Sequence, residues 1–400
     1  MSYDPMHRLK TNDMEIGATE AAAKHFERHL VTTKPVSQRK LNFERSRPRW
    51  LREMLAEMTG VFFYVYPGIA ATASTFLNQI TIENTTTLPS TPNPAFGSIF
   101  QVGWAFALGI AFAIIVCAPT SGGHFNPAIT ICFAVWQGFP WKKVPYYIFS
   151  QIFGAFLAGL LVYAQYNQQI TLYTSQVVAE GIGPVFNGGP ASIFCVFPSG
   201  PPAYPASHTQ SAGFLFLIEF FVDFFIGMII WACLDPANPF VSPQSAPFAI
   251  GLAYAVMVWG FAGITISTNL ARDLGTRIVA AIFFGGDAFT YMTYSPISIL
   301  VNVPATLCAT AYYELVMRDS LQKIGKGAAV HEGGEEGLAL HLTKSGIPME
   351  RDGMPVMEKG STNAVENGYA NGFSSANGNG VARHRGGEEV EEQVGVGQGR

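Results

Sequence analysis

The feature that most constrains this chain is the near absence of basic residues from its middle. Between Arg52 and Arg272 the only Lys and Arg residues are Lys142 and Lys143. A soluble domain of that size needs far more charge on its surface. Hydrophobic residues make up 49% of the 400 residues, and apolar runs of about 20 residues, the length of a membrane-spanning helix, recur through this region. The pattern therefore predicts an integral membrane protein.

The apolar runs divide into six predicted spans and two half-length helices. The spans cover residues 54–77, 98–118, 144–165, 212–234, 247–266 and 295–317, and the half-helices cover 126–136 and 269–281. Each half of the chain thus holds three spans and one half-helix. Because three is odd, the second half must enter the membrane from the opposite side. We expect an all-α membrane protein with two reentrant half-helices in an inverted repeat.

Each half-helix begins at an Asn that follows residues that break regular structure. The two segments are 121–128 (SGGHFNPA) and 268–273 (TNLARD). Asn is a favoured N-cap, and Pro127 at the first helical position needs no partner for its missing N–H. If both non-helical stretches line one cavity, their carbonyls are acceptors, the Asn amides are donors, and both helix N-termini direct positive dipole ends to one point. Such a pore passes neutral hydroxylated molecules and opposes cations and protons.

Charged residues are rare inside the apolar segments, and three of them bear on function. A guanidinium at membrane depth costs from about 2.5 kcal/mol upward, so Arg272 is expected to face the pore, where it donates hydrogen bonds and repels cations. Glu57 and Glu219 occupy matching positions in the two halves. Each can hold a reentrant loop by accepting its N–H groups, with His124 as a further loop support. The alternative role for the two acids is a proton relay.

The basic residues outside the core predict the orientation. With six spans, all of them fall on one side, which is the cytoplasmic side by the positive-inside rule. They are Arg45, Arg47, Arg49, Arg52, Lys142, Lys143, Arg318, Lys323 and Lys326. We therefore expect both termini in the cytoplasm and a location in the plasma membrane. The loop at 78–97 has no Lys or Arg and carries a glycosylation sequon at Asn84.

The chain divides into one predicted channel domain and two tails. Residues 1–49 form a cytoplasmic tail that is largely disordered, and residues 319–400, rich in Gly, Asn and Glu, form a second disordered tail. The channel domain, 50–318, consists of two halves joined by an outer loop. The halves are 50–165 and 211–318, and the loop is 166–210.

Together these residues resemble the aquaporin (major intrinsic protein) family over about residues 50–318. The likeness rests on Glu57, segment 121–128, Glu219 and segment 269–273, with Gln151, Gly154 and Gly159 in the third span. The resemblance implies a homotetramer in the lipid bilayer, with one pore in each subunit. It implies passage of water and, in some members, of glycerol or other small neutral solutes.

The family pattern also assigns pore residues. The midplane motifs are Asn126, Pro127 and Ala128 with Asn269, Leu270 and Ala271, and the selectivity filter comprises Phe106, Val258 (or Met257), Ile266 and Arg272. Leu270 replaces the second Pro of the family pattern, and Asp273 resembles the glycerol-conducting branch. Strict water filters have His at the fifth-span position, but residues 247–268 contain no His. The resemblance therefore implies a wider and more apolar opening.

We expect a passive channel for water and small uncharged solutes that include glycerol. Two alternatives stay open. One is a non-conducting aquaporin-like scaffold or adhesion protein, with its pore occluded by Leu270 or by the outer loop. The other is a proton-coupled carrier that uses Glu57 and Glu219. An enzyme is not indicated, because no nucleophile–base pair or metal cluster stands out, and neither a cofactor nor a nucleic-acid partner is expected.

Overall fold

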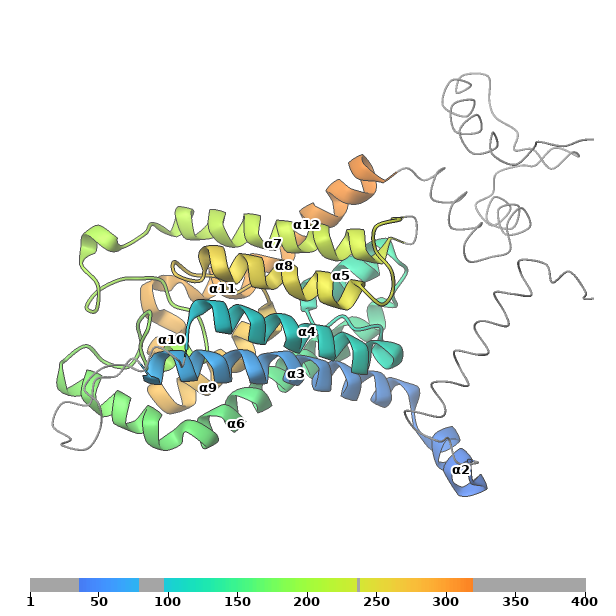
Figure 1. Cartoon of the computed structure of the whole chain (residues 1–400), viewed down its shortest axis with the longest axis horizontal. Coiled ribbons are helices and arrows are strands. Elements are labelled where there is room, and N and C mark those ends of the chain that lie inside the picture. The colour runs from blue at the N-terminus through green and yellow to red at the C-terminus, as the bar shows by residue number, and fades with distance from the viewer. Residues whose placement is uncertain (1–35, 79–96, 236–237, 319–400) are drawn as a thin grey trace, which may run out of the picture. The chain divides into compact units, whose positions relative to one another are not determined.

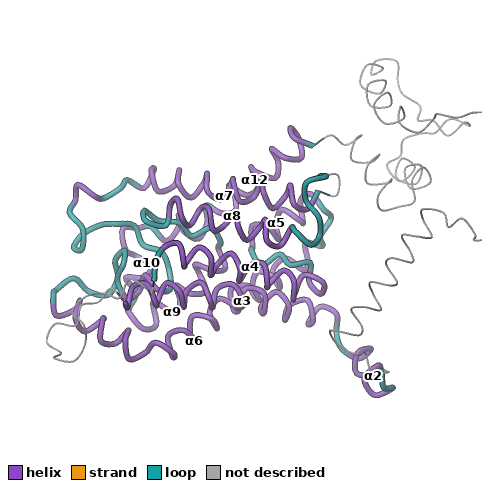
Figure 2. The backbone as a smooth tube through the Cα atoms, viewed as in Figure 1, coloured by secondary structure: helices purple, strands orange, loops and turns teal. Residues whose placement is uncertain are grey.

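The computed structural model describes residues 36–78, 97–235 and 238–318. In this part of the chain the secondary structure is helical throughout, with loops between the helices (Figure 2). The expectation of an all-α protein is confirmed. Most of the predicted N-terminal tail, the C-terminal tail from 319 onward and the Asn84 sequon lie outside the described residues.

Long apolar helices form the framework. Five segments of the described residues are long and apolar enough to cross a membrane. They contain α3 (Arg49–Asn78), α4 (Ile99–Ser121), α6 (Val144–Ala179), α7 (Ala212–Leu234) and the pair α11 (Ser295–Leu300) and α12 (Asn302–Tyr312). The shorter elements are α2 (Gln38–Ser46), α10 (Asp287–Thr290), η1 (Trp141–Lys143), η2 (Pro190–Ile193), η3 (Ala206–His208), η4 (Tyr291–Thr293) and η5 (Tyr313–Met317).

The fifth predicted span is shorter than expected. Helix α8 (Ala246–Phe261) has 16 residues and ends five residues before the predicted boundary at 266. The backbone of residues 262–269 is not helical, because buried side chains described below take over its hydrogen bonds. Apolarity alone does not show where this helix ends, since the non-helical stretch is also largely apolar.

The third span is longer than predicted. Helix α6 continues to Ala179, so residues 166–179, placed in the outer loop by their polar composition, are helical. No Gly or Pro occurs between Tyr166 and Ala179, and nothing in the backbone ends the helix until Gly181, which has a positive φ of 74°. The outer loop therefore begins after Ala179.

Two half-helices fill the interior of the bundle. Helix α5 (Pro127–Trp136) and helix α9 (Leu270–Phe284) lie toward opposite ends of the long helices (Figure 1). Each one packs against the last long helix of the other half: α5 against α12, and α9 against α6. The two half-helices also contact each other. This crossed packing is the inverted arrangement predicted from the odd number of spans.

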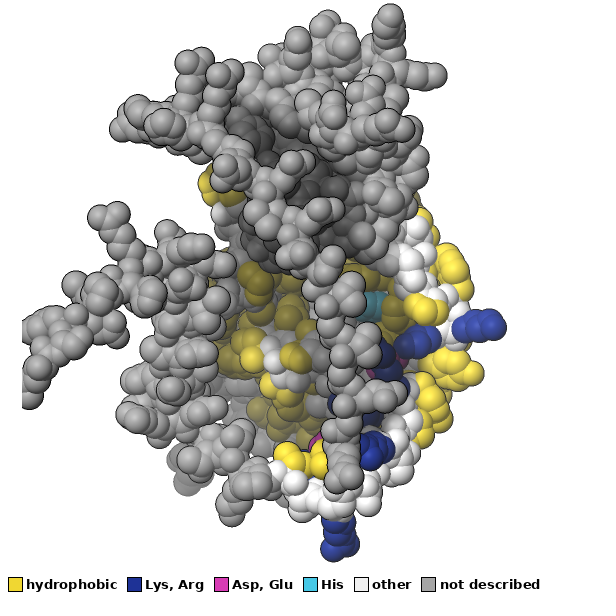
Figure 3. All heavy atoms as spheres, turned by 90° about the vertical axis from the view of Figure 1, so that its right-hand side faces the viewer, with side chains coloured by type: hydrophobic (Ala, Val, Ile, Leu, Met, Phe, Trp, Pro, Cys, Tyr) yellow, Lys and Arg dark blue, Asp and Glu magenta, His cyan; other side chains and the backbone are white. Residues whose placement is uncertain are grey.

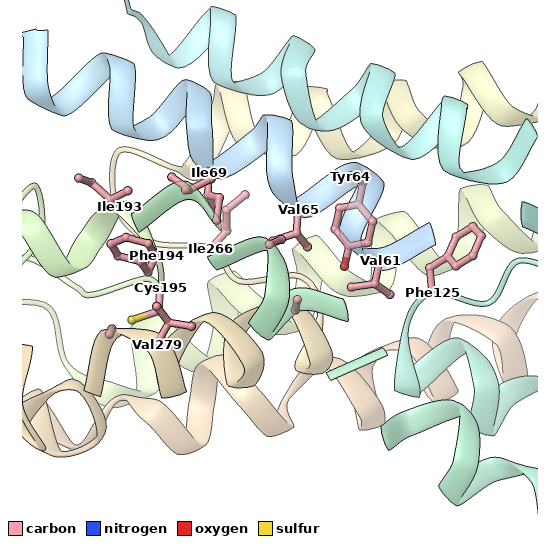
Figure 4. Close-up of a cluster of buried hydrophobic side chains, with 14 of the residues drawn as sticks. Val61, Tyr64, Val65, Ile69, Phe125, Ile193, Phe194, Cys195, Ile266 and Val279 are labelled. Carbon is pink, nitrogen blue, oxygen red and sulfur yellow. The ribbon is translucent and has the colours of Figure 1, made fainter. Parts of the chain in front are cut away.

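Close helix packing depends on glycine at two crossings. A Cβ on Gly154 of α6 would lie 2.3 Å from the Met58 carbonyl oxygen of α3, and one on Gly251 of α8 would lie 2.3 Å from the Ala107 carbonyl oxygen of α4. Apolar side chains fill the space between these helices, as Figure 4 shows for Val61 and its neighbours. Small residues let membrane helices approach closely, and dispersion contacts then stabilise the packing.

Basic side chains of the described residues gather outside the bundle core. Apart from Arg272 and Arg277, those of the larger unit lie on α2 and at the Arg47 that follows it, on the first turn of α3 and on η1. Figure 3 shows dark-blue side chains along one side of the end of the molecule that faces the viewer. The described residues 234–235, 238–240 and 313–318 belong to a separate unit. Within it the Tyr313 hydroxyl donates to the Asp235 carboxylate at 3.1 Å.

The Gly251 crossing yields a test of the packing. Gly251→Ala places a methyl group against the Ala107 carbonyl, and such overpacking costs about 1–3 kcal/mol. Gly260→Ala, on the same helix, is the matched control, because a Cβ there meets nothing within 4 Å. We expect a lower melting temperature in detergent for Gly251→Ala and an unchanged or slightly higher one for Gly260→Ala. Equal melting temperatures would contradict the close crossing.

Candidate conduction pathway

Both half-helices begin at an Asn whose side chain caps the helix. The Asn126 Oδ1 accepts from the Ala128 N–H at 2.9 Å. In the second half, the Asn269 Oδ1 accepts from the N–H groups of Ala271 at 2.9 Å and Arg272 at 3.2 Å. These caps occupy the carbonyl oxygens of the amides. The amide N–H groups are therefore directed away from the helices.

The amide nitrogens join the two half-helix starts reciprocally. The Asn126 Nδ2 donates to the Thr268 carbonyl at 3.3 Å, and the Asn269 Nδ2 donates to the Phe125 carbonyl at 2.9 Å. Both acceptor residues have left-handed backbones, with φ of 49° at Phe125 and 63° at Thr268. Such strain persists only where the surroundings hold it. Because each amide has two N–H bonds, each Asn can serve a second acceptor, and the Tyr254 side chain lies beside that of Asn126.

Glu57 of α3 holds the stretch before Asn126. Its Oε1 accepts from the Ser121 hydroxyl at 2.6 Å and the His124 N–H at 3.0 Å. Its Oε2 accepts from the Phe125 N–H and from the Gln151 side chain, both at 2.7 Å. The carboxylate is fully buried. Four donors compensate for its burial and satisfy a backbone that has left helical geometry.

Glu219 of α7 has the corresponding position in the second half. Its Oε1 accepts from the Ser267 N–H and from the Tyr294 hydroxyl, both at 2.7 Å. The Thr268 N–H reaches Oε2 at 3.5 Å. Asn302 of α12 completes the support by donating to the Thr268 carbonyl at 3.1 Å. Backbone groups of Ser267 and Thr268 are therefore bonded to side chains, as a stretch outside a helix requires.

Two of the residues assigned to the filter, Phe106 and Arg272, contact each other. The Arg272 guanidinium lies over the Phe106 ring, 5.6 Å from its centroid. Its buried Nη1 lies 3.6 Å from the Asp273 Oδ1 and makes no hydrogen bond among the described residues. Ile266 belongs to the buried apolar cluster against which Phe106 packs. Val258 and Met257 are both half-buried and both pack against that cluster. The structure thus brings Phe106 and Arg272 together. It leaves both Val258 and Met257 of α8 as candidates for the fifth-span position of the filter.

The other assigned residues lie at the starts of the two half-helices or directly before them. Leu270 occupies the first position of α9, where it replaces Pro without loss of the Asn269 cap. Pro127 and Ala128 open α5, and Ala271 follows Leu270 in the buried start of α9. His124 packs against the rings of Phe133, Phe139 and Tyr147, and its Nδ1 lies 3.3 Å from the Thr130 hydroxyl.

One buried ion pair was missed by sequence reasoning. Arg277 is 1% exposed and contacts Asp273 through Nε at 2.7 Å and Nη2 at 3.0 Å. It also donates to the carbonyls of Ala288 at 2.7 Å and Val196 at 2.8 Å, while Ser298 donates to Asp273. The pair therefore joins α9 to the outer loop and to α10 and α11. The signal was present as opposite charges four residues apart in an apolar helix.

Hydrogen bonds of Asn187 also join the outer loop to the stretch before Asn269. The Asn187 side chain donates to the Phe197 carbonyl at 2.8 Å and to the Ile264 carbonyl at 3.2 Å. The Tyr204 hydroxyl donates in turn to the Asn187 carbonyl at 3.0 Å. The loop after α6 is thus part of the wall around the second half-helix. Nothing in its composition shows which of its polar residues make these contacts.

Comparisons with known proteins agree with this geometry. The family model described as Major intrinsic protein matches residues 44–293. Aquaporin-3 of Laccaria bicolor is 41% identical over 283 residues, which are 69% of this chain and 80% of the relative. Aquaglyceroporin-2 of Rhizophagus irregularis is 31% identical over 66% of this chain and 77% of its own length.

A solved structure shows the same fold. The crystal structure of the aquaglyceroporin from Plasmodium falciparum superposes with a TM-score of 0.52. It covers 67% of this chain and 97% of its own, at 21% sequence identity. The fold is thus shared at low sequence identity.

The Asp273–Arg277 pair can be tested by a double-mutant cycle. Arg277→Gln leaves the Asp273 carboxylate buried without its main partner, and breaking a buried pair from one side costs about 3–5 kcal/mol. Adding Asp273→Asn removes that unpaired charge, so the double variant should melt at a higher temperature in detergent than Arg277→Gln alone. Strictly additive losses in the cycle would contradict direct coupling of the two side chains.

Proposed function

Because the chain belongs to the major intrinsic protein family, we propose that it is a passive channel for water and small uncharged solutes, glycerol among them. The observation that carries the proposal is the reciprocal pair of bonds between the two half-helix starts. It brings two N-termini to one place, where their dipoles produce a positive potential. A neutral solute exchanges hydrogen bonds there, whereas a cation is repelled.

Arg272 supports this assignment as the charged member of a constriction. Its buried Nη1 makes no hydrogen bond among the described residues, although it lies 3.6 Å from the Asp273 Oδ1, and its guanidinium faces the Phe106 ring. A buried donor without a hydrogen-bond acceptor can donate to a solute oxygen. We assign the selectivity filter to Phe106, Arg272 and Ile266, with Val258 or Met257 as the fourth member.

The inclusion of glycerol is supported by the lining of this constriction. Phe106 and Ile266 are apolar, and so are both candidates on α8. An apolar wall opposite a hydrogen-bonding Arg suits a polyol, whose carbon backbone contacts the wall while its hydroxyls bind the donors. A relative named as an aquaglyceroporin is in keeping with this solute class.

The roles of the two acids follow from their contacts. Glu57 accepts four hydrogen bonds and Glu219 accepts bonds from Ser267 and Tyr294. We assign both residues, with His124, to the support of the reentrant stretches. This use of their oxygens does not favour a proton-coupled carrier.

We further propose a homotetramer in the plasma membrane with cytoplasmic termini. Large apolar side chains such as Phe112, Phe149 and Phe221 are exposed on the long helices, which leaves faces for lipid and for other subunits. The basic residues of α2, α3 and η1 support a cytoplasmic position for that end of the bundle.

Stopped-flow light scattering on proteoliposomes tests the channel function. We expect faster shrinkage in an impermeant osmolyte and faster glycerol re-entry than in empty vesicles, with no imposed proton gradient. Transport that requires a proton gradient would contradict the channel and favour a carrier. Equal rates in both vesicle populations would favour the non-conducting scaffold.

Arg272→Val tests the constriction. Loss of the guanidinium removes a positive charge and bulk, so we expect larger polyols to pass and a cation leak to appear in a dye-based flux assay. Arg45→Val, an exposed position on α2, is the matched loss of one Arg and should leave both measurements unchanged. Wild-type selectivity in Arg272→Val would remove this residue from the filter.

A further inference from the structure

Tyr64 of α3 is a buried polar side chain that none of the contacts described so far uses. It is 4% exposed, and its hydroxyl has no hydrogen-bond partner among the described residues. A buried hydroxyl without a partner costs about 1–3 kcal/mol. Buried hydroxyls therefore take water or another ligand when the protein offers no acceptor. Figure 4 shows the Tyr64 ring extending from α3 with its oxygen directed into the interior.

The face of α3 places Tyr64 on the pathway. Glu57 and Gly68 share a helix face with Tyr64, because seven and four residues are about two turns and one turn. Glu57 holds the stretch before Asn126, whereas a Cβ on Gly68 would lie 2.2 Å from the Phe106 ring. Tyr64 is thus positioned between the half-helix starts and the Phe106–Arg272 constriction.

Three ionisable side chains lie close enough to Tyr64 to act on its hydroxyl electrostatically. They are Tyr254 of α8, Arg272 and Glu57. Tyr254 lies in turn beside the Asn126 side chain. Two tyrosines from different helices, α3 and α8, thus lie near Arg272 and the Asn126 side chain. Of these groups, the Tyr64 hydroxyl has no hydrogen-bond partner among the described residues.

We propose that Tyr64, with Tyr254 of α8, forms a second constriction at which the tyrosine hydroxyls bind the hydroxyl groups of a passing polyol. The inference rests on the proposed channel function and adds solute-binding residues to it. A hydroxyl both donates and accepts, so it can replace a hydration contact of glycerol that Arg272, a donor only, cannot replace. The two rings also limit the width of the solute at this level.

Removing the hydroxyl alone is the direct test. Tyr64→Phe keeps the ring, and the loss of one neutral hydrogen bond corresponds to about a twofold to tenfold lower glycerol permeability. We expect water permeability to fall by less, so that the ratio of glycerol to water decreases. Tyr254→Phe should change the ratio in the same direction. Tyr66→Phe is the matched control, because the Tyr66 hydroxyl donates to Gln165 at an exposed site.

The ring is tested separately by size. Tyr64→Ala should raise the permeability ratio of erythritol, a four-carbon polyol, to glycerol. All measurements use full-length protein in proteoliposomes, with tetramer content and helicity compared by size exclusion and circular dichroism. A wild-type glycerol-to-water ratio in both Tyr→Phe variants would overturn the inference while the channel function stands. Absence of flux in the wild type would instead contradict the channel function itself.

Discussion

The structure depends on two buried carboxylates that accept hydrogen bonds from a backbone without helical geometry. In a bilayer every N–H and C=O group must find a partner inside the protein or in a water-filled cavity. Glu57 and Glu219 supply such partners to the residues before Asn126 and Asn269. Because these stretches are held by side chains, α4 and α8 can end within the bundle and a new helix can begin there. The pathway exists only where the two interruptions meet.

The reciprocal bonds between the half-helix starts turn two local interruptions into one site. Each Asn uses its oxygen for its own helix and a nitrogen for the carbonyl before the other helix. The two halves therefore fix each other, and the left-handed residues Phe125 and Thr268 are held by the same bonds. Rigid donors of this kind are effective for selectivity, because a passing solute meets them without rearrangement of the protein.

Among the described residues, the second half-helix α9 carries a buried ion pair that has no counterpart in α5. The buried pair of Asp273 and Arg277 joins α9 to the outer loop, and Asn187 ties that loop to the Ile264 carbonyl. These contacts surround the half-helix that bears Arg272. The selectivity role proposed for Arg272 requires its guanidinium to keep one position, and a network of buried charged bonds restrains its helix more strongly than apolar packing alone. The second motif, in which Leu270 replaces Pro, is thus also the one whose half-helix has the additional contacts.

The sequence by itself determined the class of fold, the two half-helices that begin at Asn126 and Asn269, and the candidate pathway residues. Hydropathy, charge distribution and capping are local properties, so a short stretch of sequence is enough to recognise them. The ends of α6 and α8 predicted from the sequence are wrong. Polar residues can continue a helix, as in α6, and apolar residues can lie outside one, as after α8. Only the tertiary structure decided the partners of Arg277, the position of Tyr64 and the donors to Glu219. Those contacts join residues far apart in the chain, and a buried polar group finds its partners through packing that no short stretch of sequence contains.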